Sequence, residues 1–306
     1  MPMLLKLLAA RPALVFFSGL YPHQNGHIAL AGRFGGKYHK GVPNFIQSLN
    51  RVGYHTGITY KIHVDPESSF PFDRTYLHDR YRKDNSDPKD GRQTAKYFRD
   101  FLKGVPNDAP FYFQAQIHDT HRPFPRQNEK GRNKYKINLD YKNSPYNILS
   151  KKDVDPIPFF GPDIKQTDDL MKDVAAYYND IQRVDRAVGM WMKELKRTGE
   201  FENTLILFTS DHGPGYGRGK LSVYEFGLTV PMVMIWPGVS QPDMRRDQFV
   251  SFADMMPTFL DAAGLEIPDY LPGSSLKSVI QQDDEIRDFA FGEYIVHTPV
   301  EDYWPA

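Results

Sequence analysis

Apolar and polar positions follow two periods along this chain, one typical of strands and one typical of helices. The apolar run at 205–209 has the length of a buried strand, and residues 111–117 alternate apolar with small or polar side chains. Between them, Thr167 followed by two aspartates predicts the start of a long helix, and Gly199 predicts its end. The apolar positions of that helix keep a helical period: 171, 174, 178, 181, 184, 188, 191 and 195.

Shorter elements complete the predicted pattern. Helices are expected at 43–50, 94–102 and 254–264, and a last strand is expected at 289–295. Most of residues 1–18 are predicted to form an amphipathic helix that leads into Gly19. Lys6, Arg11 and Pro12 interrupt the apolar run, which is shorter than the ~20 residues of a membrane span. Strands alternating with helices indicate a mainly parallel α/β sheet.

Composition narrows the class of protein without naming a function. The 306 residues are enough for one large α/β domain or two modest ones. Lysine plus arginine and aspartate plus glutamate each total 38, so no overall charge favours nucleic acid or a membrane surface. Hydrophobic residues make up 40% of the chain, which is ample for a packed core. Cysteine is absent, which excludes disulfides and thiolate metal sites.

Polar residues with metal and anion chemistry directly follow the strand at 205–209. Asp211 offers a hard oxygen ligand and His212 a second polar ligand, at the strand end where α/β sheets bind ligands. Lys220 adds a positive charge nearby, and glycines let the backbone approach a bound anion at positions 213, 215, 217 and 219. A P-loop is excluded because Pro214 and Leu221 stand where its glycine and hydroxyl residue are required.

Two other segments carry candidate polar groups. Lys61 and His63 are two residues apart in an extended run and so share a face. His118 and His121 follow the strand at 111–117. A solvated strand face is the plainer interpretation of the first pair, and turn histidines without a role are the plainer interpretation of the second.

Several motifs together resemble the sulfatase family, and within it the heparan N-sulfatase and iduronate-sulfatase branch. The segment TSDHG, a lysine nine residues after the aspartate, and VYEFGLTVPMVMIWPG carry the resemblance most closely. It extends to GLYPHQNG at 19–26, GYHTGITYKIH at 53–63 and HDTHRPF at 118–124. FVSFADMMPTFLDAAGLEIP adds a further match, so the resemblance covers most of the chain.

The resemblance implies an alkaline-phosphatase-like fold, with a mainly parallel mixed sheet flanked by helices. It implies a single, incomplete sulfatase catalytic domain over residues 1–306, lacking the family's first strand and its C-terminal subdomain. It also implies roles for particular residues: Lys61, His63, His121 and Lys220 in catalysis, Asp211 and His212 as calcium ligands, and His118, Glu293 and His297 at the substrate.

The chain also departs from the family pattern. The family's nucleophile is a formylglycine made from Cys or Ser, but the corresponding window, 9–13, contains neither. Arg11 is the only stand-in for the arginine of that motif, and Tyr60 replaces a glycine before Lys61. The pair of metal-binding aspartates on the family's first strand is also missing. These departures imply weakened Ca²⁺ binding and no formylglycine.

The resulting expectation is a sulfatase-family hydrolase of sulfate esters or N-sulfate on carbohydrate that is inactive as written. Three alternatives stay open: a non-catalytic module that binds sulfated glycan, a phosphodiester or phosphonate hydrolase of the same superfamily, and a misassigned start at Met1. The resemblance implies a periplasmic, lysosomal or secreted protein, although the N-terminus shows no clear signal peptide. The sugar, its linkage and the oligomeric state stay open.

Overall fold

The strands form one mixed sheet whose order follows an α/β topology. The computed structural model describes residues 3–6, 10–28, 36–60, 62, 64–77, 89–122, 124, 149–156, 160–220 and 222–293. Within these residues the six-stranded sheet has the order β3-β2-β4-β1-β5-β6. The strands are β1 (Met3–Lys6), β2 (His55–Tyr60), β3 (Arg74–Leu77), β4 (Phe111–Gln114), β5 (Leu205–Thr209) and β6 (Met232–Ile235). All neighbours pair in parallel except β6, which is antiparallel to β5, so the predicted mainly parallel sheet is confirmed.

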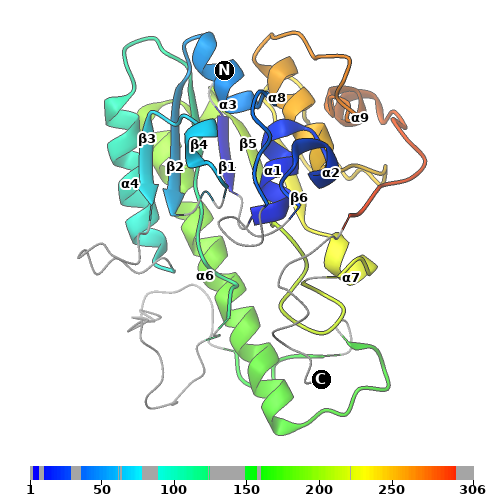
Figure 1. Ribbon diagram of the computed structural model, residues 1–306. Coiled ribbons are helices and arrows are strands. Elements are labelled where there is room, and N and C mark those ends of the chain that lie inside the picture. The colour runs from blue at the N-terminus through cyan, green and yellow to red at the C-terminus, as the bar shows by residue number, and fades with distance from the viewer. Residues whose placement is uncertain are drawn as a thin grey trace.

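Helices cover both faces of the sheet (Figure 1). Helices α1, α3 and α8 pack on one face, and α4 and α6 pack on the other. The helices are α1 (Ala10–Ser18), α2 (Pro22–Asn25), α3 (Phe45–Arg51), α4 (Gly91–Gly104), α6 (Asp168–Thr198), α7 (Glu225–Leu228), α8 (Met255–Ala262) and α9 (Lys277–Gln282), with 3-10 turns η1 (Glu67–Ser69), η3 (Phe201–Asn203) and η4 (Phe252–Asp254).

Strand β4 shows why the sheet is buried on both sides. Phe111 and Phe113 pack against the α4 and α6 face, whereas Tyr112 between them packs with α1, α3 and α8. Successive side chains of a strand point to opposite faces, and both faces are covered here. All four residues of the strand, including Gln114, are therefore buried, and the strand has no solvated side.

Helix α6 begins and ends where the sequence predicts. The Thr167 side chain accepts a hydrogen bond from the Leu170 amide at 3.3 Å, and Gly199 takes a left-handed conformation with φ of 79°. One predicted core position is wrong, because Ile181 is 38% exposed while its neighbour Asp180 is fully buried. At this level the inward side of α6 meets charged groups below the sheet, and so the buried stripe includes an acid.

The opening of the chain differs from the predicted single helix. Residues 3–6 form β1, which pairs with β4 on one side and β5 on the other. The helix predicted over most of residues 1–18 is therefore confirmed at 10–18, where α1 lies, and does not include 3–6. Pairing with two neighbouring strands overrides local helix preference here.

Two smaller differences concern strands. Strand β3 was not predicted, because its sequence, RTYL, is polar; it pairs with β2 alone and lies at the edge of the sheet, where polar residues are tolerated. The last strand predicted at 289–295 is absent over 289–293, the part of it that the structure describes. Among the described helices, none combines the length and the apolar character that crossing a membrane requires.

Candidate active site

Five of the candidate residues follow parallel strands that end at one edge of the sheet: His118, His121, Asp211, His212 and Lys220. Strands β4 and β5 both lie parallel to β1, so their carboxyl ends share one edge of the sheet. In Figure 1 this is the lower edge, beyond which the first half of α6 extends. The turn at 118–121 follows β4, and the segment 210–220 follows β5. Ligands of open α/β sheets bind at such an edge.

Asp211 and His212 form a close pair directly after β5. Oδ2 of Asp211 lies 3.0 Å from Nε2 of His212. Nδ1 of His212 lies 2.6 Å from the Gly213 carbonyl oxygen, which can only accept, so Nδ1 carries a proton. Burial raises the pKa of the Asp211 carboxyl, and the charges of His212 and Lys220 oppose that rise. His212 and Lys220 therefore both act on the Asp211 carboxylate.

Two glycines of this loop serve its own backbone. A Cβ at Gly213 would lie 1.8 Å from the Phe226 carbonyl oxygen, and one at Gly219 would lie 2.2 Å from that of Pro214. The loop closes on itself through the Lys220 amide, which donates to Pro214 O at 2.8 Å. Gly213 and Gly219 are thus required by the close approach of neighbouring backbone, and their role beside a bound anion stays a prediction.

The Asp211–His212 pair supplies one side of a cation site but not a calcium cage. With Nδ1 bound to the Gly213 carbonyl, Nε2 faces the Asp211 carboxylate and can bind a cation beside it once the ring has lost its second proton. Calcium takes about 6 to 8 oxygen ligands. Among the described residues, however, no group of three or more His, Cys, Asp or Glu side chains is arranged to hold a metal. The described donors do not fit calcium on their own.

The turn after β4 carries His118 and His121. The His121 amide donates to His118 O at 2.7 Å, which closes the turn. Nδ1 of His121 lies 2.6 Å from the Arg122 carbonyl oxygen and therefore carries a proton, which leaves Nε2 as the basic nitrogen of a neutral ring. The His118 ring lies 5.9 Å from the Tyr60 ring, centroid to centroid.

Arg122 joins the two candidate segments. Its Nε donates to Gly215 O at 3.2 Å, in the loop that carries Asp211 and Lys220. Its guanidinium also pairs with Asp173 of α6 through two hydrogen bonds, 3.1 and 2.6 Å long. The same group lies over the rings of Phe124, at 4.3 Å, and Tyr216, at 5.1 Å. The ends of β4 and β5 are thereby held together at the predicted site.

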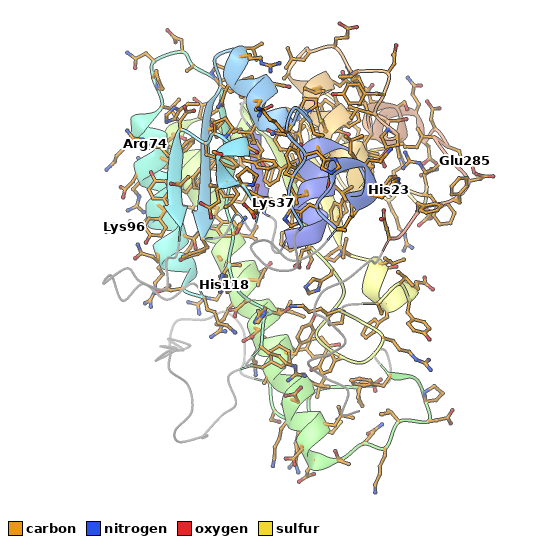
Figure 2. All side chains as sticks on the ribbon, viewed as in Figure 1. His23, Lys37, Arg74, Lys96, His118 and Glu285 are labelled. Carbon is orange, nitrogen blue, oxygen red and sulfur yellow. The ribbon has the colours of Figure 1, made fainter. Side chains whose placement is uncertain are left out.

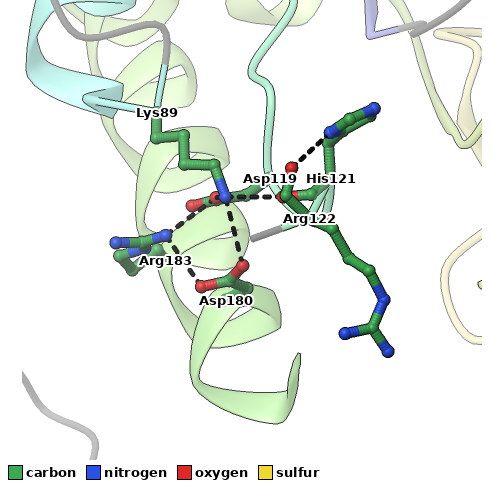
Figure 3. Close-up of polar contacts among 6 residues, drawn as sticks. All are labelled: Lys89, Asp119, His121, Arg122, Asp180 and Arg183. Atoms are coloured by element: carbon green, nitrogen blue, oxygen red, sulfur yellow. Dashed lines mark hydrogen bonds and ion pairs between the residues drawn. The ribbon is translucent and has the colours of Figure 1, made fainter. Parts of the chain in front are cut away.

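A buried cluster of four charges lies beneath the turn after β4, and the sequence did not predict it (Figure 3). Arg183 donates to Asp119 at 2.8 Å and to Asp180 at 2.7 Å. The Lys89 ammonium lies 3.2 Å from Asp119 and 3.6 Å from Asp180. The available signal was spacing: Asp173, Asp180 and Glu194 recur at multiples of seven on α6 and are all buried.

Glu293 lies apart from the turn after β4. Its Oε2 is 2.8 Å from Nδ1 of His23, which belongs to α2. Figure 2 shows His118 below the strands and His23 to one side, near α2. Lys61, His63 and His297 lie outside the described residues. The convergence of Lys61 with Asp211, His212, Lys220 and His121 therefore stays a prediction.

Tyr60 and Ser18 bear on the departures from the family pattern. Tyr60, where the resemblance expects glycine, has a φ of 60°, the left-handed region that glycine favours. Ser18, the first serine of the chain, is fully buried, and its hydroxyl donates to Leu14 O at 2.6 Å. A hydroxyl held inside a helix in this way cannot replace the family's nucleophile.

Comparisons with known proteins agree with the fold and the motifs. A sequence model of the sulfatase family matches residues 13–265, so the chain belongs to the sulfatase family. It is 30% identical over 280 residues to the human N-sulphoglucosamine sulphohydrolase, covering 83% of this chain and 51% of that protein. It is 27% identical over 283 residues to an ulvan-active sulfatase of Formosa agariphila, covering 90% of this chain and 49% of that protein.

A solved structure extends the agreement to three dimensions. A protein in complex with its substrate, D-glucosamine-2-N,6-O-disulfate, superposes with a TM-score of 0.68 at 18% identity, covering 97% of this chain and 76% of that one. At this identity the likeness shows the fold, which is that of the alkaline-phosphatase-like sulfatases. The chain spans about half the length of the curated relatives it matches.

Proposed function

We propose that the edge of the sheet below β4 and β5 binds the sulfuryl group of a sulfated carbohydrate. Lys220 supplies positive charge, and His121 supplies a ring nitrogen for the leaving oxygen. Asp211 and His212 form the part of a cation site that faces the same group. Lys61 and His63 join from the end of β2, with His118 and His297 at the sugar.

One observation carries this proposal. The hydrogen bond from Arg122 to Gly215 O ties the segment with His121 to the segment with Asp211 and Lys220. Sulfate-ester hydrolysis depends mainly on charge and position around the sulfuryl oxygens, as phosphoryl transfer does. A fixed relation between these two segments is what such a site requires. The names of the relatives, which include enzymes of N-sulfoglucosamine and of ulvan, favour a sugar substrate.

We further propose that this chain binds the substrate without cleaving it. The nucleophile of the family comes from a cysteine or serine, and the chain has no cysteine. Ala9 and Ala13 bound the window where that residue belongs, and Ser18, the nearest hydroxyl, donates inside α1. Without an attacking group the sulfur–oxygen bond is not broken, whatever stabilises the leaving oxygen.

Isothermal titration calorimetry with D-glucosamine-2-N,6-O-disulfate tests the binding proposal. We expect the wild-type chain to bind, and Lys220→Ala to bind at least about tenfold more weakly because a charge at the sulfuryl group is lost. Lys96→Ala is the matched control, since Lys96 is exposed on α4, at the β3 side of the sheet and away from β5 (Figure 2). No heat with the wild-type chain at millimolar sugar, or equal heat from Lys220→Ala, contradicts the proposal.

Hydrolysis assays test the second proposal separately. We expect no sulfate release from 4-nitrophenyl sulfate by the wild-type chain. Release above that of a His121→Ala, Lys220→Ala double variant contradicts the loss of activity. Parallel assays with a phosphate diester and a phosphonate monoester distinguish a sulfatase from the other hydrolases of the superfamily.

A further inference from the structure

The Lys89 ammonium makes one contact that charge balance alone does not explain. It donates to the backbone carbonyl oxygen of His121 at 2.6 Å, in addition to its ion pairs with Asp119 and Asp180 (Figure 3). Lys89 precedes α4, whereas His121 follows β4, so the contact links two segments far apart in sequence. A charged donor on a backbone carbonyl fixes that peptide more firmly than a neutral one does.

The rest of the cluster holds the ammonium in place. The side chains of Asp119 and Asp180 are 0% exposed, that of Lys89 is 7% exposed, and that of Arg183 is 10% exposed. Two cations therefore face two carboxylates in a nearly water-free space. Such groups have little freedom to move, because moving one of them leaves another buried without a partner.

Helix α6 presents its charged residues to the turn along one face. Asp173 pairs with Arg122, and Asp180 and Arg183 lie seven and ten residues further on. Positions i, i+7 and i+10 fall on the same side of a helix. Helix α6 therefore contacts both ends of the segment from 119 to 122, and Lys89 binds the His121 carbonyl between these ends.

We propose that Lys89 is a positioning residue, which fixes the backbone of His121 and thereby aims its imidazole at the anion site. The role of the imidazole rests on the function proposed above, whereas the fixing of the backbone does not. Lys89 itself is directed at the peptide and at two carboxylates and does not touch the substrate.

Two variants separate positioning from charge balance. Lys89→Met leaves two buried carboxylates with one cation, so we expect a large loss of stability. Lys89→Met combined with Asp180→Asn keeps one cation and one anion, Arg183 and Asp119, at 2.8 Å. We expect the double variant to regain most of the urea midpoint that the single variant loses. It still lacks the donor to His121 O.

NMR of protein labelled at histidine ¹³Cε1 reports on His121 directly. The chain has 10 histidines, and His121→Gln assigns the signal. In the double variant we expect the His121 signal to shift or to split, because its peptide is no longer held. In the single variant Lys89→Arg, which keeps a charged donor, we expect the His121 signal close to its wild-type position. In Lys96→Met we expect the signal to be unchanged. An unchanged His121 signal in a folded double variant overturns the proposal, and so does failure of the double variant to fold.

Binding of D-glucosamine-2-N,6-O-disulfate separates this proposal from the proposed function. We expect about tenfold weaker binding by the double variant, because a small misplacement of a site residue is costly. A displaced His121 signal, together with a wild-type chain that does not bind the sugar, supports the role of Lys89 and rejects the sugar site. If the double variant shows an undisplaced His121 signal and binds the sugar as the wild type does, the role of Lys89 is rejected and the sugar site is retained.

Discussion

Helix α6 carries two buried carboxylates whose pKa values move in opposite directions. Asp180 and Glu194 lie about four turns apart, and their side chains are 0% and 7% exposed. Burial, and then repulsion from Asp119, raises the pKa of Asp180 to about 7. Hydrogen bonds, first from Arg99 and then from Arg197, lower the pKa of Glu194 to about 2 against the effect of burial.

The difference lies in the partners and not in the burial of the acid. Asp180 shares Lys89 and Arg183 with a second carboxylate, and these cations are buried too. Glu194 has two guanidinium groups to itself, and both are about half exposed. The ionised form of a buried carboxyl group is favoured when its cationic partners stay in contact with water and pair with no other acid.

The largest expected effect comes from removing one acid of the buried cluster. Asp119→Ala leaves Lys89 and Arg183 facing a single carboxylate in a buried space. We expect the free energy of unfolding to fall by about 3 kcal/mol, because an uncompensated buried charge is costly. Urea denaturation at pH 7 measures it, with Asp100→Ala on the exposed side of α4 as control. A loss below about 1 kcal/mol contradicts this account of the cluster.

The second effect is the pH dependence of the Asp180 carboxyl. Its pKa in the folded protein, about 7, exceeds the ordinary value of 3.8. The folded state therefore binds more protons between those values, and stability falls as pH rises from about 4 to 7. The slope that this group contributes is at most about 1.4 kcal/mol per pH unit.

Asp180→Asn replaces the titrating carboxyl group with an amide that does not titrate, and so isolates the contribution of Asp180 to the pH dependence. We expect the free energy of unfolding of the wild type, minus that of the variant, to decrease as pH rises through this window. Urea denaturation of both proteins at each pH measures the difference. A difference that stays constant from pH 4 to pH 7 shows that Asp180 is ionised throughout.

The smallest effect concerns Glu194. Its lowered pKa adds stability above about pH 4.5, and that stability is lost as pH falls toward 2. Since solvent screens the two half-exposed arginines, we expect Glu194→Gln to cost only about 1 kcal/mol at pH 7.

Salt sharpens the contrast between the two sites. The cost of Glu194→Gln should shrink in 1 M NaCl, where charges are screened within about 3 Å, while the cost of Asp119→Ala should change little. Thermal or urea denaturation at low and high salt measures both, with Glu202→Gln as an exposed control. Equal salt sensitivity of the two variants would remove the distinction between a solvated and a buried network.

Local sequence patterns predicted the elements that carry their own signals. Thr167 and Gly199 mark the ends of α6, the run at 205–209 is β5, and Gly264 has the left-handed conformation expected after α8. The segments that hold Asp211, His212 and His121 were also predicted to follow strands, and they do. Caps, periods and strand lengths depend on near neighbours, so one sequence contains them.

Other features depend on partners far along the chain. Strand β1 exists because β4 and β5 flank residues 3–6, and β3 exists because β2 offers an edge. Neither segment has a strand pattern strong enough to predict alone. Asp180 is buried and its neighbour Ile181 is exposed, because Lys89 faces this side of α6 and pairs with the Asp180 carboxylate.

The sequence by itself determined the family, the order of most helices and strands, and the residue types at the sheet edge, because these are written in local patterns and motifs. Only the tertiary structure decided that Arg122 bridges the ends of β4 and β5, that Lys89 reaches His121, and that Asp180 and Glu194 have opposite pKa shifts. The physical reason is that charge interactions and burial act through space, between groups whose distance along the chain says nothing of their distance in the fold.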